Sequence, residues 1–157
     1  MMLACDERSP VAGGEKEEPN EPPIKITTED TDEGCKVRIL NGAPVIRRIE
    51  VILKEPFYHF NSLVGKYGFY IKPVHKIYKT INGVRRVYAY YGKYWLKREG
   101  NKVVYAGSRK PRVIPDKVMS KLHSFTIIFE EEDVIMDCWV YEKLKKYFEG
   151  LHVEKTF

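Results

Sequence analysis

The chain has 157 residues, of which 43% are hydrophobic and 31% charged, so it holds enough apolar material for one compact domain. Its three cysteines form no CxxC pair, and no apolar run follows Met1 that would serve as a secretory signal. No apolar stretch reaches the roughly 18 residues that a membrane-spanning helix requires. These features argue against a membrane protein and predict a reduced, cytoplasmic one.

Charge is distributed unevenly along the chain. The net charge is only +5, yet the regional sums are −7 for residues 1–35, +3 for 36–65, +13 for 66–121 and −4 for 122–157. Because a partner meets the local field rather than the average, the basic region predicts an acidic partner such as nucleic acid.

The acidic N-terminal region is rich in Glu, Pro, Gly and Thr and has almost no large apolar side chains. Such a composition does not offset the entropy lost on ordering. Residues 1–34 are therefore predicted to be a disordered tail, followed by a single globular domain over residues 36–157. A second hypothesis is that the tail folds back over the basic region as a phosphate mimic.

Amide side chains are scarce. The chain has no Gln and five Asn, while Lys, Arg, Glu, Ile, Val and Tyr are abundant. Avoidance of thermolabile amides together with many ion-pairing residues is typical of proteins that work at high temperature. The composition predicts a thermophilic source, an archaeon or one of its viruses or mobile elements, although a codon bias toward AT could produce the same pattern.

The first predicted element is a hairpin. Two β-rich runs, residues 37–39 and 45–53, flank the turn sequence at 41–44. Residues 56–64 then predict a short helix, beginning at its proline and capped by Gly65, with an irregular loop as the alternative.

A second hairpin is predicted from the pair Asn82-Gly83, which favours a two-residue type I′ turn. Strands over residues 74–80 and 84–91 then meet in a fixed register. In this register Lys79 lies opposite Arg86, and since like charges repel across strands, an anion bound between them would relieve the repulsion. The predicted pairs are His75/Tyr90, Lys76/Ala89, Ile77/Tyr88, Tyr78/Val87, Lys79/Arg86, Thr80/Arg85 and Ile81/Val84.

The remaining pattern predicts an α+β fold. Strands over residues 93–98 and 102–106 extend the hairpin into a meander, and a basic loop at 107–112 follows. We further predict a short helix over 117–123, a strand over 124–130 and a long C-terminal helix over 133–149, which acids begin and Gly150 caps. The fold class is thus α+β, with a central antiparallel β-meander of about five to seven short strands, a long C-terminal helix and one or two short helices.

Cations and aromatic rings are interleaved between Lys66 and Lys121, a stretch that contains fifteen Lys or Arg residues and only two acids. Cations bind phosphates and flat rings stack on bases, so a basic-aromatic sheet over residues 66–112 predicts a protein that binds DNA or RNA with little sequence specificity. Alternation along a strand places about half of the rings in the core. The candidate contacts are Lys76, Lys79, Arg85, Arg86, Tyr88, Tyr90, Lys93, Trp95, Lys97, Arg98, Lys102, Arg109, Lys110 and Arg112.

Three alternatives stay open. The sheet could carry Tyr and Lys for stability and solubility alone. A metal-dependent nuclease would need converging carboxylates around Mg²⁺ or Mn²⁺, for which Glu50 and Glu55 are the candidates; no other cofactor and no metal-ligand spacing is evident. A protein-interaction or virion structural module would use the sheet edge and the C-terminal helix. The oligomeric state is left open, a dimer included.

Overall fold

The computed structural model describes residues 34–156, which fold as an α+β protein with a six-stranded and a three-stranded antiparallel sheet. The tail predicted for residues 1–34 lies, apart from Gly34, outside the described residues. Two compact units are present: the first combines residues 34–48 with 132–156, and the second is Ile49–Glu131. No helix within residues 34–156 is long and apolar enough to cross a lipid bilayer.

The first unit is built around a central strand. Strand β1 (Lys36–Ile39) pairs antiparallel with β8 (Asp133–Asp137) on one side and with β9 (Val153–Thr156) on the other. Alternate side chains of β1 and β8 are fully buried, as expected for a sheet with one face on the core. The helical elements of this unit are α2 (Ala43–Arg48), α5 (Cys138–Leu144) and η2 (Lys145–Phe148).

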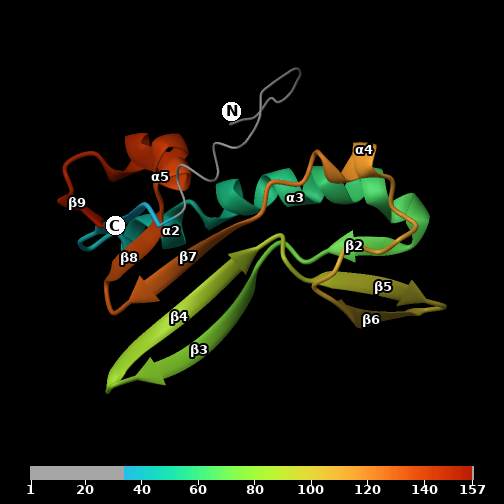
Figure 1. Cartoon of the computed structure of the whole chain (residues 1–157), viewed down its shortest axis with the longest axis horizontal. Helices are drawn as coiled ribbons and strands as arrows, with labels where there is room; N and C mark the ends of the chain where they lie inside the picture. The colour runs from blue at the N-terminus through green and yellow to red at the C-terminus, as the bar shows by residue number, and fades with distance from the viewer. Residues whose placement is uncertain (1–33, 157) are drawn as a thin grey trace. The chain divides into compact units, whose positions relative to one another are not determined.

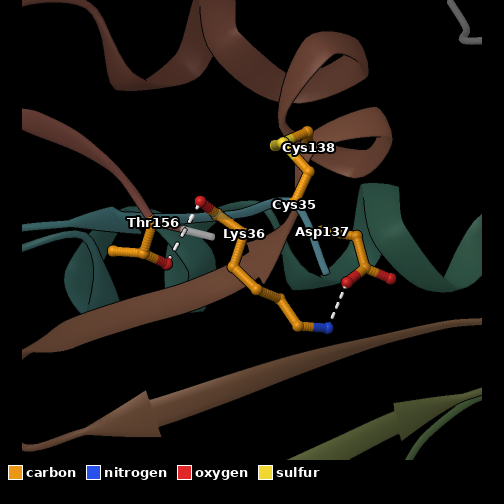
Figure 2. The surroundings of a disulfide bond; sticks show 5 residues. All are labelled: Cys35, Lys36, Asp137, Cys138 and Thr156. Carbon is orange, nitrogen blue, oxygen red and sulfur yellow. Dashed lines mark hydrogen bonds and ion pairs between the residues drawn. A yellow bond between two sulfur atoms is a disulfide. The ribbon is translucent and has the colours of Figure 1, made fainter. Parts of the chain in front are cut away.

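A disulfide bond between Cys35 and Cys138 joins the start of β1 to the start of α5 (Figure 2). Beside it, Lys36 forms an ion pair with Asp137, and the Thr156 hydroxyl donates a 3.4 Å hydrogen bond to the Lys36 carbonyl. The prediction that the cysteines are reduced is therefore wrong for these two. Sequence spacing gave no hint of the bond because 103 residues separate the partners, and only the antiparallel pairing of β1 with β8 brings them together.

The long C-terminal helix predicted over residues 133–149 is also wrong. Its first third is strand β8, in which buried Val134 and Met136 alternate with more exposed neighbours at the two-residue period of a strand. Arg38 Nη2 of β1 donates a 2.9 Å hydrogen bond to the Asp133 carboxylate. Asp133, expected to begin a helix, thus joins strand β8 to its partner. Helix α5 has only seven residues.

The second unit contains the long helix α3 and two hairpins, β3–β4 and β5–β6 (Figure 1). Strands β3, β4 and β7 form one group and β2, β5 and β6 the three-stranded sheet; the full order of the larger sheet is β3-β4-β7-β8-β1-β9. The elements of this unit, in chain order, are α3 (Glu50–Val64), η1 (Gly65–Tyr67), β2 (Phe69–Ile71), β3 (His75–Ile81), β4 (Val84–Tyr91), β5 (Trp95–Glu99), β6 (Lys102–Gly107), α4 (Asp116–Met119) and β7 (Phe125–Glu130).

The first predicted hairpin does not form, because the run over residues 45–53 is helical. Leu53, Phe57, Phe60 and Val64 are buried along one side of α3, at the spacing of three and four that a helix requires. Pro56 lies inside this helix rather than at its start. The β-branched residues of the run had suggested a strand, but burial at helical spacing outweighs that propensity.

The second hairpin is confirmed, because β3 and β4 pair in the predicted register from His75 opposite Tyr90 to Ile81 opposite Val84. The continuous meander is wrong: the other neighbour of β4 is β7, whereas β5 pairs with β2 and β6. Gly92, with φ of +74°, turns the chain away after β4. The β5–β6 hairpin, the short helix near 117 and the strand near 124–130 are present as predicted, within a residue or a few of the expected bounds.

Candidate nucleic-acid interface

The sheet formed by β3, β4 and β7 has one face on the core. On that face Tyr91 is fully buried and stacks on Phe125 with ring centroids 4.7 Å apart, and Phe57 of α3 packs against both rings. Because side chains alternate, the opposite face carries the other half of each strand. It presents His75, Ile77, Lys79, Arg86, Tyr88, Tyr90, Thr126, Ile128 and Glu130.

Four tyrosines connect that opposite face to the three-stranded sheet, and we call them the tyrosine strip: Tyr88, Tyr90, Tyr94 and Tyr105. Their ring centroids lie 6.3 Å apart from Tyr88 to Tyr90, 6.0 Å from Tyr90 to Tyr94 and 6.1 Å from Tyr94 to Tyr105. Tyr105 is 67% exposed, and the other three are half-buried. The rings form one contiguous aromatic cluster, in which Tyr88 and Tyr90 are nearly parallel at 17°, Tyr94 is edge-on to Tyr90 at 82° and Tyr105 is tilted from Tyr94 by 42°. Exposed aromatic rings are the groups on which bases stack in single-strand-binding proteins.

Lysines lie over the rings of the strip. Lys93 Nζ is 4.3 Å from the Tyr90 centroid and 5.5 Å from that of Tyr94, and Lys79 Nζ is 5.1 Å from that of Tyr88. Such cation–π contacts are worth about 0.5–1 kcal/mol each at exposed sites. They hold positive charge beside the half-buried rings of Tyr88, Tyr90 and Tyr94, so the strip carries both a cation, which attracts phosphate, and aromatic rings, on which bases stack.

Arg86 contributes to the same face, with much of its charge already compensated. Its Nη1 donates a 3.2 Å hydrogen bond to the Tyr88 hydroxyl and its Nε a 2.8 Å hydrogen bond to Glu130. The hydrogen bond to Tyr88, followed by that to Glu130, raises the pKa of Arg86 and keeps it charged. The repulsion expected between Lys79 and Arg86 is thus relieved from within the chain, by the Glu130 carboxylate.

His75 closes the strip on the side of β3. Its ring lies 4.7 Å from that of Tyr94, and Lys72 Nζ donates a 2.9 Å hydrogen bond to its Nδ1. Partial burial, and then the charge of Lys72, lower the pKa of His75. The ring is therefore neutral near pH 7 and serves as an acceptor that orients Lys72 rather than as a cation of its own.

Several predicted contacts lie elsewhere. Trp95 is a correction: it is 2% exposed and packs edge to face on Phe60 at 6.1 Å, so it cannot stack on a base. Lys76 and Arg85 lie on the opposite face of the β3–β4 hairpin from the strip, where Lys76 forms a 3.3 Å ion pair with Glu50.

A second basic cluster surrounds an open cleft of about 490 Å³, which we call the basic cleft. Strand pairing places Phe69 opposite Lys97, while Tyr105 lies opposite Leu96, so the basic cleft and the strip are on opposite faces of the three-stranded sheet. Arg98 shares the face of Tyr105, and exposed Lys102 faces Glu99 across the β5–β6 hairpin. The residues lining the cleft are Phe69, Lys97, Ala106, Arg109, Lys110, Pro111, Arg112 and Val113.

The carboxylates named for a nuclease do not converge. Glu50 is engaged by Lys76, and Glu55 is exposed farther along α3. Among residues 34–156, no group of three or more His, Cys, Asp or Glu side chains is placed to hold a metal ion. The described part of the chain therefore offers no carboxylate cluster on which metal-assisted cleavage could be built.

The candidate list drawn from the sequence missed Tyr94 and Tyr105, although both lie in the basic-aromatic region. Tyr94 is next to buried Trp95, and alternation says only that the two rings point to opposite sides. Which of the two side chains faces the core depends on how β5 pairs. The sequence therefore predicts that Tyr94 and Trp95 lie on opposite faces, but it does not predict which of them is buried.

Comparison with known proteins adds no assignment. The chain matches no family model, and no curated protein or solved structure is detectably similar to it.

Proposed function

We propose that this protein binds DNA or RNA with little sequence preference, and that the tyrosine strip is its contact surface. The observation that carries the proposal is the contact of Lys79 and Lys93 with the faces of rings that touch one another from Tyr88 to Tyr105. Cations supply the sequence-independent attraction to phosphate, and the rings supply stacking that tolerates any base.

Single strands suit this surface better than duplex. In a duplex the bases are already stacked on one another and their faces are closed to protein rings, whereas a single strand can lay its bases on an aromatic sheet. Each stacked base contributes about 1–3 kcal/mol as judged by alanine substitution. A strip of four rings therefore favours a short single-stranded segment.

The cellular setting is part of the same proposal. An intracellular protein of a thermophile would match both the amide-poor composition and the Cys35–Cys138 disulfide, since intracellular proteins of hyperthermophiles are an exception to the rule that disulfides mark secreted proteins.

The test is fluorescence anisotropy with labelled single-stranded and duplex oligonucleotides of mixed sequence. We expect tighter binding of the single strand, and a loss of about tenfold on Tyr105→Ala, the value of roughly 1.4 kcal/mol of stacking. Tyr78→Ala is the matched control. Tyr78 is 71% exposed, as Tyr105 is 67% exposed, but it lies on the face of the β3–β4 hairpin opposite Tyr88 and Tyr90 and so outside the strip. Equal effects of the two substitutions would contradict the proposal.

A protein-interaction module is the second candidate. The end of the β3–β4 hairpin exposes three apolar side chains, Tyr78, Ile81 and Val84, at 71%, 45% and 37%. If oligonucleotide binding is absent, or insensitive to salt, this hairpin end becomes the surface to test for a protein partner.

A further inference from the structure

The basic cleft differs from the tyrosine strip in position and in composition. It lies on the other face of the three-stranded sheet, so a strand stacked on Tyr105 does not enter it without passing around the β6 edge. Its lining combines four cations with four apolar or aromatic side chains and contains no acid. An open cleft whose lining is half basic and half apolar fits a ligand with an anionic and a flat apolar part.

The cations of the cleft come largely from one anchored turn. Arg109, Lys110 and Arg112 surround Pro111, whose carbonyl accepts a 3.2 Å hydrogen bond from the Ile114 backbone amide. Ile114 itself is fully buried, so the turn is fixed to the core on one side while its charged side chains remain exposed. Arginine side chains carried on a fixed turn can present their guanidinium forks to the several oxygens of a phosphate.

The charges of the cleft are only partly compensated. Lys110 forms a 3.2 Å ion pair with Asp116, and Lys97 a 3.8 Å pair with Glu99. The Asp116 side chain is 98% exposed, which makes that pair weak and readily exchanged for another anion. Lys97 Nζ also lies 5.9 Å from the centroid of Phe69, so charge and an aromatic ring meet inside the cleft.

We infer that the basic cleft is a separate binding site for a mononucleotide phosphate. The phosphate lies among Arg109, Lys110 and Arg112, and the base lies against Phe69. The volume of about 490 Å³ is within the range of roughly 300–1,000 Å³ that is usual for small-ligand pockets. This site does not depend on the tyrosine strip, and it would persist if the strip bound nothing.

The experiment is calorimetric titration of the full chain with adenosine 5′-monophosphate, inorganic phosphate and adenosine. We expect the monophosphate to bind more tightly than either part alone, and Arg109→Ala with Arg112→Ala to weaken it at least tenfold, the scale of losing one or two charge-assisted hydrogen bonds. Arg98→Ala is the control, because Arg98 is an exposed arginine of the same sheet on the opposite face, and it should leave the affinity unchanged.

Three results would overturn the inference. Equal affinity of the wild type and the double variant would remove the arginines from the site. Binding of the monophosphate no tighter than that of phosphate would remove the base from Phe69. Loss of monophosphate binding on Tyr105→Ala, with the double variant unaffected, would place the nucleotide on the tyrosine strip.

Discussion

Breaking the Cys35–Cys138 disulfide should cost this protein a large part of its stability. The bond closes a loop across a sequence separation of 103 residues, and that loop contains the whole of the second unit, Ile49–Glu131. In the chain-entropy relation a closed loop of about 100 residues lowers the stability of the unfolded state by about 4.7 kcal/mol at 25 °C. Typical domains are stable by only about 5–15 kcal/mol, so the effect is decisive.

The assay is urea unfolding of a Cys5→Ser variant, with and without reductant, so that only the two bonded thiols change. The chain has two tryptophans, and they report on different units: Trp139 lies in α5 beside the disulfide, and Trp95 lies in the core of the second unit. Variants with Trp95→Phe or Trp139→Phe therefore follow each unit by fluorescence. We expect reduction to lower the Trp139 transition at least as much as the Trp95 transition.

Two results would refute this reasoning. Free thiols at both positions in the purified, non-reduced protein would show that the bond does not form. An unchanged urea midpoint on reduction would show that closing the loop between Cys35 and Cys138 does not measurably lower the entropy of the unfolded chain. Comparing reduction with the double Cys35→Ser, Cys138→Ser variant separates the bond from any cost of burying hydroxyls in place of sulfur.

Three further predictions concern substitutions within the second unit. Lys79→Ala with Lys93→Ala should flatten the dependence of log affinity on log salt by about 1.4 for a single strand, about 0.7 for each lost phosphate contact, measured by anisotropy between 50 and 300 mM salt, taken as roughly the accessible range. The pKa of His75 is lowered in the folded state, so its contribution to the free energy of unfolding is fully present above the unfolded pKa of about 6.5 and is lost as the pH falls through the folded pKa. The melting temperature of His75→Phe should therefore decrease less than that of the wild type when the pH is lowered from about 8 to about 5. Trp95→Ala should destabilise by about 3–5 kcal/mol in urea, whereas an exposed ring, if that is what Trp95 were, would change stability by about 0.5 kcal/mol or less.

Local turn chemistry is the part of this fold that the sequence predicts well. Asn82 and Gly83 both adopt positive φ, 52° and 80°, as the type I′ turn requires, and that requirement alone fixes every pair of the β3–β4 hairpin. The segments that were predicted wrongly depend on partners far away. Residues 133–137 form a strand because β1 is available to pair with them, and nothing within those residues states it.

The candidate interface divides in the same way. Alternation from the turn places Tyr88, Tyr90 and Lys79 on one face without further information. Alternation does not predict which of the two faces α3 covers. Residues 45–53 were expected to form a strand, so a helix beginning at Glu50 was not expected to cover either face. The choice between Tyr94 and Trp95 as the exposed ring depended in addition on the pairing of β5 with β2, which places Trp95 against Phe60 of α3.

The strip crosses from one hairpin to the other, so its continuity rests on the short segment between β4 and β5. Gly92 in that segment has φ of +74°, and a Cβ there would lie 2.3 Å from Cε1 of Phe57. The residue is therefore limited to glycine by both its backbone and its contact with α3. Ser124 adds a 2.6 Å hydrogen bond to the Gly92 carbonyl. A core contact thus aligns Tyr90 with Tyr94, and the aromatic surface follows from how α3 packs as much as from the tyrosines themselves.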